Sequence, residues 1–149
     1  AKTLGIDIKE EFSEYYNVKV GVIGSLPQTS INAFFKKVRT KAGHDITLLN
    51  YGPNKVGKIG IVAGGGNDGD IALELIEKGV NTYLTGVIKP GTYPPSIKFL
   101  KLVKSNKINV IGITHYTSEK YACIALIQYF KDLKLSCKFI EGKPDMLDI

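Results

Sequence analysis

Residues 56–86 read VGKIGIVAGGGNDGDIALELIEKGVNTYLTG and decide the class of fold. The β-branched segment Val56–Ala63 is typical of a strand, and the glycine loop Gly64–Gly69 ends it. Asp70–Lys78 has the apolar spacing of a helix, and Val80–Thr85 is apolar and β-rich like a second strand. A strand, a helix and a strand in close succession predict a right-handed crossover between parallel strands.

The remainder of the chain continues this alternation. Downstream, we expect a helix, a strand, a helix and a strand at Pro95–Ser105, Asn109–Thr114, Ser118–Leu133 and Leu135–Ile140. Upstream, we expect a strand, an amphipathic helix and a short strand at Val18–Ile23, residues 31–42 and Ile46–Leu49. Residues 1–17 are polar with scattered apolar positions, so a short helix or an irregular lead-in is expected there.

This order of elements predicts an α/β fold with a mixed, largely parallel sheet covered by helices on both faces. The length of 149 residues indicates one domain over residues 1–149. The first strand, helix and strand, within residues 1–54, are expected to form a small appended lobe of that domain.

The net charge of +6 comes mainly from lysine, since Arg39 is the only arginine. The lysines are spread along the chain, and sequence-specific recognition of nucleic acid favours arginine, so such binding is not expected. No segment approaches the ~18 uninterrupted apolar residues of a membrane helix, and no signal peptide opens the sequence. We therefore expect no membrane partner and a cytoplasmic location.

The two cysteines make neither a zinc-site pattern nor a disulfide framework. Cys123 falls in a predicted apolar helix and Cys137 in a predicted apolar strand. Both are expected to be buried free thiols, which are generally inert.

The glycine loop has the spacing G-x-G-x-x-G between a strand and a helix, as in dinucleotide-binding sites. Such sites need an acidic residue about 20 positions later, which this sequence lacks, and Asp68 and Asp70 would repel a phosphate. Two interpretations stay open: a tight turn with Asn67 or Asp68 capping the helix, and a loop facing a substrate or anion. The candidate residues for the second interpretation are Gly64, Gly65, Gly66, Thr85 and Gly86.

A second motif, THYTSE, follows the predicted strand Asn109–Thr114, where open α/β sheets gather their ligands. His115 and Glu119 are four residues apart and share one face if the segment is helical. An imidazole and a carboxylate suit Zn, Mn or Fe. Alternatively, Glu119 belongs to a helix cap formed with Thr117 or Ser118, and His115 bonds only to the backbone.

A metal site also needs at least three protein ligands, and this pair supplies two. The other histidine, His44, follows a predicted helix and is expected at the exposed surface. Acid–base chemistry at neutral pH would therefore have to use His115.

Three segments together resemble the C-terminal part of the Nif-three-like family, also called GTP cyclohydrolase I type 2. They are VGKIGIVAGGGNDG at residues 56–69, NTYLTG at residues 81–86 and GITHYTSE at residues 112–119. The resemblance implies a dinuclear metal site in which His115 and Glu119 match the two C-terminal ligands. The family's other ligands, a His-His pair and an Asp, belong to its N-terminal half.

No His-His pair occurs in this sequence, so the resemblance implies an incomplete site here. It also implies a homo-oligomer, because family members often form ring-like hexamers. The opening AKTLGI is similar to the end of the helix that follows the family's first half. With Ala1 at the start and Met146 as the only methionine, we expect part of a longer protein.

Three functions follow as hypotheses. The first is a metal-binding protein with hydrolase or GTP cyclohydrolase-like activity. The second is a non-catalytic assembly or metal-handling module, suggested by Val87-Ile88-Lys89 where many family members have an acidic residue. The third is a nucleotide-binding domain that uses the glycine loop.

Overall fold

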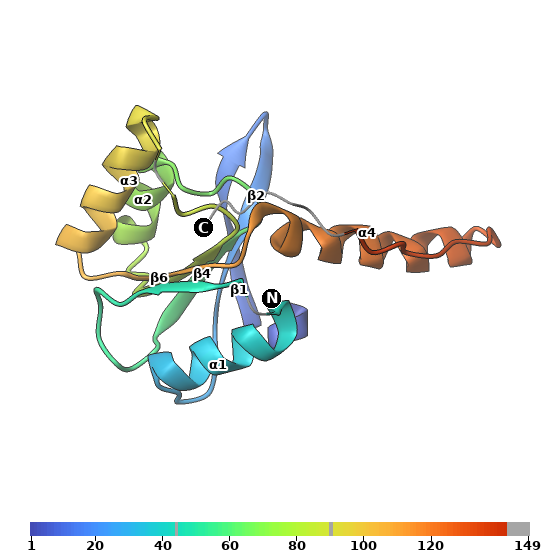
Figure 1. Ribbon diagram of the computed structural model, residues 1–149, viewed down its shortest axis with the longest axis horizontal. Helices are drawn as coiled ribbons and strands as arrows, with labels where there is room; N and C mark the ends of the chain where they lie inside the picture. Colours follow the sequence, from blue (N-terminus) through green and yellow to red (C-terminus); the bar gives the residue numbers. More distant parts are fainter. Residues whose placement is uncertain (44, 90, 143–149) are drawn as a thin grey trace.

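The computed structural model describes residues 1–43, 45–89 and 91–142. Its centre is one six-stranded sheet in the order β1-β2-β4-β5-β6-β3 (Figure 1). The strands are β1 (Asp7–Tyr15), β2 (Val18–Ser25), β3 (Thr47–Leu49), β4 (Lys58–Val62), β5 (Thr82–Thr85) and β6 (Asn109–Gly112). The helices are η1 (Lys2–Leu4), α1 (Ile31–Ala42), α2 (Gly69–Glu77), α3 (Pro94–Ser105) and α4 (His115–Asp132).

The predicted mixed α/β fold is confirmed. The parallel pairs are β4–β5 and β5–β6, as residues 56–86 indicated. Antiparallel pairing is more extensive than the sequence pattern suggested, because β1–β2, β2–β4 and β3–β6 are all antiparallel. The parallel strands therefore form the middle of the sheet, and their carboxyl ends meet at one edge.

Helices cover both faces of the sheet. On one face, α2 and α3 pack through fully buried residues such as Leu75, Phe99 and Val103. On the other face, α1 packs through Ile31, Phe34 and Val38. Figure 1 shows α2 and α3 together on one side of the sheet and α1 on the opposite side.

Residues 1–17 correct a sequence-based expectation. Instead of a helix or an irregular lead-in, they form η1 and the nine-residue strand β1. β1 lies at the edge of the sheet and most of its residues face solvent, which explains the polar sequence; Phe12 is its fully buried anchor. Residues 1–54 contribute β1, β2 and β3 to the common sheet, so this segment is integrated into the domain rather than appended to it.

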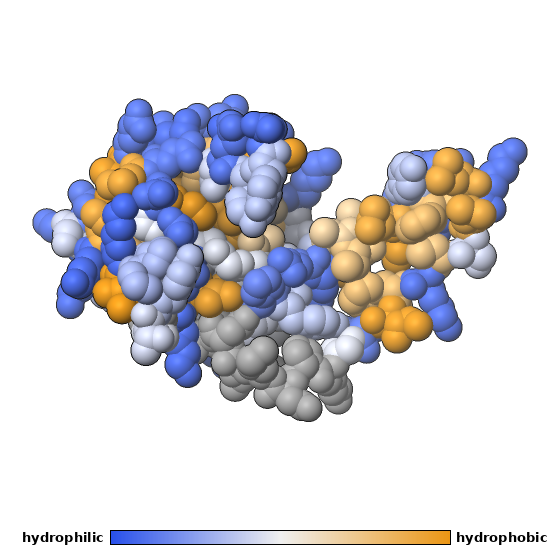
Figure 2. Space-filling model, turned by 90° about the horizontal axis from the view of Figure 1, so that it is seen from above, coloured by the Kyte–Doolittle hydropathy of each residue, from blue (hydrophilic) through white to orange (hydrophobic). Residues whose placement is uncertain are grey.

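Helix α4 is the largest departure from expectation. It was expected to be largely covered, but none of its residues is buried, and it projects away from the sheet as an arm (Figure 1). Figure 2 shows hydrophobic side chains gathered on this arm. The exposed large apolar residues of the arm and of the segment after it are Ile124, Leu126, Tyr129, Leu133, Leu135 and Ile140. The sequence analysis interpreted this apolar pattern as a sign of burial, but no described part of the chain covers these side chains.

The segment after α4 is likewise corrected. Residues 135–140 form no strand but return beside the helix, where Lys120 pairs with Glu141 at 2.8 Å. The backbone N–H and C=O groups of a helix are already hydrogen-bonded within the helix. A segment that lies beside α4 therefore finds no backbone partners there with which to pair as a strand. Cys123 and Cys137, expected to be buried, are both exposed as a result. His44 lies outside the described residues.

In the part of the chain that the structure describes, no helix is long and apolar enough to cross a membrane.

Candidate metal centre

The three sequence motifs meet at the carboxyl ends of β4, β5 and β6. The glycine loop follows β4, Thr85 ends β5 with Gly86 directly after it, and His115 begins α4 three residues after the end of β6. The side chains and loops from segments far apart in the sequence therefore face one another at a single edge of the sheet, which is where such folds bind ligands.

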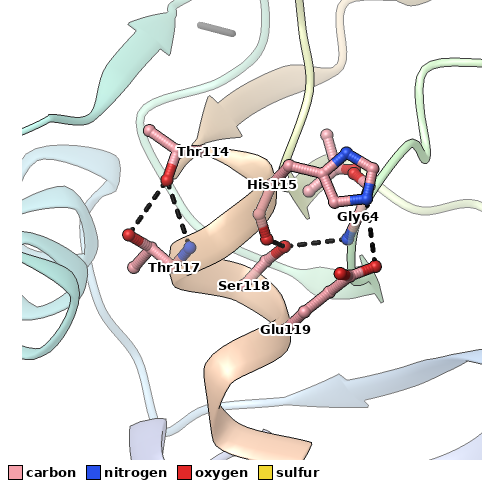
Figure 3. A network of polar contacts seen from close by, with 7 residues as sticks. Gly64, Thr114, His115, Thr117, Ser118 and Glu119 are labelled. Atoms are coloured by element: carbon pink, nitrogen blue, oxygen red, sulfur yellow. Dashed lines mark hydrogen bonds and ion pairs between the residues drawn. The ribbon is translucent and has the colours of Figure 1, made fainter. Parts of the chain in front are cut away.

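His115 and Glu119 are brought together as their spacing predicted. Both lie in the first turns of α4, and His115 Nε2 is 3.1 Å from Glu119 Oε1 (Figure 3). The two side chains are 50% and 54% exposed, so both are partly open to solvent. The cap of α4 is not Thr117 or Ser118, as the alternative held, but Thr114, whose hydroxyl accepts from the Thr117 N–H at 3.2 Å.

This geometry fits a shared divalent metal ion. Two ligands of one Zn²⁺ ion, each roughly 2.0–2.2 Å from it, lie about 3–3.5 Å apart. The 3.1 Å between the two atoms, which are hydrogen-bonded to each other in this structure, falls in that range, so both could bind one ion with little movement of the backbone. Among the residues that the structure describes, no third His, Cys, Asp or Glu joins them in a metal-binding group.

Ser118 connects the helical turn that carries His115 and Glu119 to the glycine loop. Its hydroxyl accepts the N–H of Gly64 at 2.8 Å and donates to the carbonyl of His115 at 2.8 Å (Figure 3). Sequence reasoning considered Ser118 only as a cap. Its distance of 54 positions from Gly64 explains why no local pattern revealed this contact.

Gly64 is held at its carbonyl group as well. This oxygen accepts the N–H of Gly66 and the N–H of Val87, each at 3.0 Å. The hydroxyl of Thr85 donates to the same oxygen at 3.4 Å. With φ at +69°, Gly64 has a left-handed conformation that glycine adopts without strain.

Gly86 and Gly66 make room for close packing, whereas Gly65 has nothing within 4 Å of a Cβ. A Cβ at Gly86 would lie 2.6 Å from Ser118 Oγ and 3.0 Å from the Cα of His115. A Cβ at Gly66 would collide with the hydroxyl of Tyr83, which donates to the Gly66 carbonyl at 2.8 Å. Burial raises the pKa of Tyr83, so its hydroxyl remains a donor at neutral pH.

These contacts bear on the anion-binding alternative. The N–H groups of Gly64 and Gly66 are already engaged within the protein, and Asp68 caps α2 by accepting from the Asp70 N–H at 2.8 Å. Two carboxylates at this helix start disfavour a phosphate. A role in building the turn accounts for the glycines, and anion binding stays a prediction.

A cleft of about 740 Å³ is lined in part by His115 and Glu119. It is rich in carboxylates and has no lysine or arginine in its lining, although the chain as a whole is basic. The acidic side chains that line it are Glu14, Asp68, Asp70, Glu74 and Glu119. Glu14 and Asp70 are paired with Lys19 and Lys98, and the field of the remaining carboxylates favours cations near His115.

Sequence reasoning missed the wall formed by Ser13, Glu14 and Tyr15. These residues belong to β1, which was not predicted as a strand. The Ser13 N–H donates to Glu74 on α2 at 3.0 Å and thereby holds this wall against the helix.

Comparison with known proteins supports this fold and shows the family to which the chain belongs. The model of the Duf34/NIF3 (NGG1p interacting factor 3) family matches residues 1–145, and the chain belongs to that family. A GTP cyclohydrolase 1 type 2 homolog from Archaeoglobus fulgidus is 30% identical over 132 residues, which are 88% of this chain and 48% of the relative. A protein of the same name from Pyrococcus horikoshii is 25% identical over 133 residues, 88% of this chain and 49% of the relative. The chain thus spans about half the length of these relatives.

Solved structures support the fold alone, since their sequence identities are low. Protein ybgI, of unknown function, matches with a TM-score of 0.80 at 16% identity, over 97% of this chain and 54% of that one. TTHA1606 from Thermus thermophilus matches with a TM-score of 0.67 at 18% identity, over 97% of this chain and 53% of that one.

Proposed function

We propose that this chain supplies half of a divalent-metal site, with His115 and Glu119 as ligands for Zn, Mn or Fe. The observation that carries the proposal is the pair of donor atoms 3.1 Å apart at the carboxyl edge of the parallel strands. The acidic lining of the adjacent cleft adds support, because it raises the local concentration of cations. The remaining ligands would come from a segment that this chain does not contain.

The reaction we propose is a metal-dependent hydrolysis of the GTP cyclohydrolase type, in line with the names of the relatives. A bound divalent metal ion lowers the pKa of water and clamps oxygen atoms in a hydrolytic transition state. The chain itself would hold the ion through His115 Nε2 and Glu119 Oε1. Gly65 and the β1 residues that line the cleft would border the substrate.

A non-catalytic assembly or metal-handling role is the second candidate. It is favoured by the segment after Gly86, where Ile88 is buried and its side chain packs against Gly112. An apolar residue committed to the core cannot serve as an acid or base there. The nucleotide-binding hypothesis has less support, because the loop N–H groups of Gly64 and Gly66 are already engaged.

We also propose that the chain forms a homo-oligomer through the α4 arm. Large apolar side chains lie exposed along this helix, and a second copy would remove them from water. In Figure 2 the hydrophobic residues of the arm project beyond the rest of the molecule.

Because two protein ligands alone hold a metal weakly, the metal proposal is tested by equilibrium dialysis of the chain against Zn, Mn or Fe(II), with bound metal per chain measured by elemental analysis of both compartments. We expect bound metal in the wild type and its loss in His115→Ala and Glu119→Gln. Glu77→Gln, at another exposed helical carboxylate, is the matched control and should retain the metal. Equal metal content in all four proteins would refute the site.

Hydrolysis separates the first two candidates. A nucleotide panel is incubated with the metal-loaded protein and with His115→Ala, and products are measured by chromatography. Turnover that depends on His115 supports the hydrolase, whereas bound metal without turnover of any nucleotide supports the metal-handling module.

A further inference from the structure

We infer that Ser118 is a positioning residue that fixes the glycine loop against the metal-binding pair. This inference rests on the proposed metal site and adds to it a residue that touches neither the metal nor the substrate. It concerns the hydroxyl that joins α4 to the backbone of Gly64.

The placement of Ser118 on α4 is the first argument. Residues three and four apart lie on one face of a helix, so Ser118 shares a face with His115. Glu119 is the next residue after Ser118 and lies on the same side of α4 as His115. Figure 3 shows the three side chains together, with Gly64 facing them. The glycine loop therefore docks on the face of α4 that carries the metal ligands.

The two hydrogen bonds of the hydroxyl are the second argument. By accepting from Gly64 and donating to His115, Ser118 links two backbone segments that no secondary-structure element joins. Its proton is directed to the His115 carbonyl, which leaves an oxygen lone pair for the Gly64 N–H. Both bonds are 2.8 Å long.

The closeness of the loop to the donor atoms is the third argument. A Cβ at Gly64 would collide with Glu119 Oε1 and lie 3.0 Å from His115 Nε2. The backbone of Gly64 therefore packs closely against both side chains. A shift of this backbone would change the space available to them for holding an ion. Groups that hydrogen-bond directly to metal-ligating side chains typically contribute 10–100-fold to affinity. Ser118 acts one step further away, through the backbone of Gly64 and His115, so its contribution should lie at the lower end of that range.

A purely structural interpretation treats the Ser118–His115 bond as ordinary back-bonding within a helix. Thr40 makes such a bond, to the carbonyl of Lys36 at 3.0 Å, on an exposed part of α1. Thr40→Ala is therefore the matched control for the loss of a back-bonding hydroxyl.

The experiment compares Mn²⁺ dissociation constants, measured by calorimetry, for the wild type, Ser118→Ala, Ser118→Thr and Thr40→Ala. We expect Ser118→Ala to weaken binding by about 10-fold, the lower end of the effect of a direct partner of a metal ligand. Ser118→Thr keeps the hydroxyl and should recover most of the affinity, and Thr40→Ala should bind as the wild type does. In Ser118→Ala the amide resonance of Gly64 should also shift, because its acceptor is gone.

His115→Ala is measured in parallel so that two failures are distinguishable. If His115→Ala abolishes binding while Ser118→Ala binds as the wild type does, the inference about Ser118 is overturned and the metal site stands. If His115→Ala leaves binding unchanged, or the wild type binds no Mn²⁺, both are overturned. Ser118→Cys, with a weaker hydrogen-bonding group of similar shape, replaces Ser118→Ala if thermal unfolding shows that the latter does not fold, and it should bind more weakly than the wild type.

Discussion

At the scale of single residues, two neighbouring glycines beside the candidate site have different surroundings. Gly64 is buried, has a positive φ and faces Glu119 and His115, whereas Gly65 is exposed, with nothing within 4 Å of the position of a Cβ. The first glycine is required by geometry and the second is not.

Gly64→Ala should destabilise the protein and weaken metal binding, while Gly65→Ala should do neither. An alanine with left-handed backbone angles costs roughly 1–2 kcal/mol, and its methyl group would displace the Glu119 carboxylate. Denaturant unfolding measures the first effect and Mn²⁺ affinity the second. A Gly64→Ala protein as stable and as tightly binding as Gly65→Ala would contradict this description of the site.

Thr114 is the other residue whose backbone is unusual. Its φ of 65° and ψ of 150° lie in a region that is nearly restricted to glycine, and Thr is β-branched, which makes the strain greater. It stands directly before His115, at the start of α4, so its conformation sets the direction in which the ligand-bearing turn begins.

Thr114→Gly should leave the protein at least as stable as the wild type. Relief of strain worth about 1–3 kcal/mol outweighs the few tenths lost with a Gly cap and the entropy of Gly in the unfolded chain. Thr114→Val keeps the strain and loses the capping hydroxyl, and it should be destabilised by about 1 kcal/mol. Free energies of unfolding for the three proteins provide the check, and a Gly variant less stable than the Val variant would argue against strain at this position.

Much of the residue-scale site was predictable from the sequence, but its connections were not. The spacing of His115 and Glu119, together with the strand before them, was sufficient to place them on one face at the edge of the sheet. The reason that Gly64 must be glycine is a contact with side chains about 50 positions away, and Ser118 meets Gly64 through the fold alone. Local sequence patterns contain no information about such contacts.

At the scale of elements, sequence patterns predicted the α-helices and every strand of the sheet except the edge strand β1. β1 was missed because an edge strand with solvent on most sides has a polar sequence. α4 was correctly predicted as a helix, but the prediction that it is largely covered was wrong. An apolar helical sequence does not show whether another part of the same chain packs against it. The contacts that hold β1 against α2 also escaped the sequence patterns: the Ser13 N–H donates to Glu74 at 3.0 Å, and Lys78 bonds to Glu10 at 2.8 Å.

The pairing of Glu10 with Lys78 gives a pH dependence to the attachment of β1. The hydrogen bond from the Lys78 ammonium lowers the pKa of the Glu10 carboxyl and raises the pKa of Lys78. The stabilisation from a lowered carboxyl pKa is present above the unfolded-state pKa of 4.5 and is lost as the pH falls through the folded-state pKa.

Thermal midpoints of the wild type and Glu10→Gln should therefore differ at pH 7 and converge in strongly acidic solution. The difference at pH 7 should be small and should shrink in high salt, because the pair is at the surface. A difference that persists unchanged at acidic pH would assign the effect of Glu10 to packing instead of charge.

At the scale of the whole molecule, a compact sheet domain carries an apolar arm that its own described residues do not cover. The side chain of Leu126 is 51% exposed in the middle of this arm. Since exposed apolar patches of this kind usually mark interaction sites, the arm is the natural place for contact with a second copy.

Light scattering on the wild type should give a mass above the 16.3 kDa of one chain, and Leu126→Glu should reduce it. Leu73→Glu, at a residue 47% exposed on α2, is the control and should leave the mass unchanged. The thiol of Cys123, exposed in the single chain, should react more slowly with a thiol reagent in the assembled wild type than in Leu126→Glu. A wild type that remains a single chain at all concentrations would exclude self-association through the arm.

The central claim, that His115 and Glu119 bind a divalent metal, is tested most directly by adding Mn²⁺ to ¹⁵N-labelled protein and recording which amide resonances broaden. Paramagnetic broadening reports the position of the ion even when binding is weak. The account predicts that the resonances of Gly64 and residues 115–119 broaden first, and that Glu119→Gln removes this effect. Broadening centred on Asp68, Asp70 and Glu74, or none near His115, would contradict it.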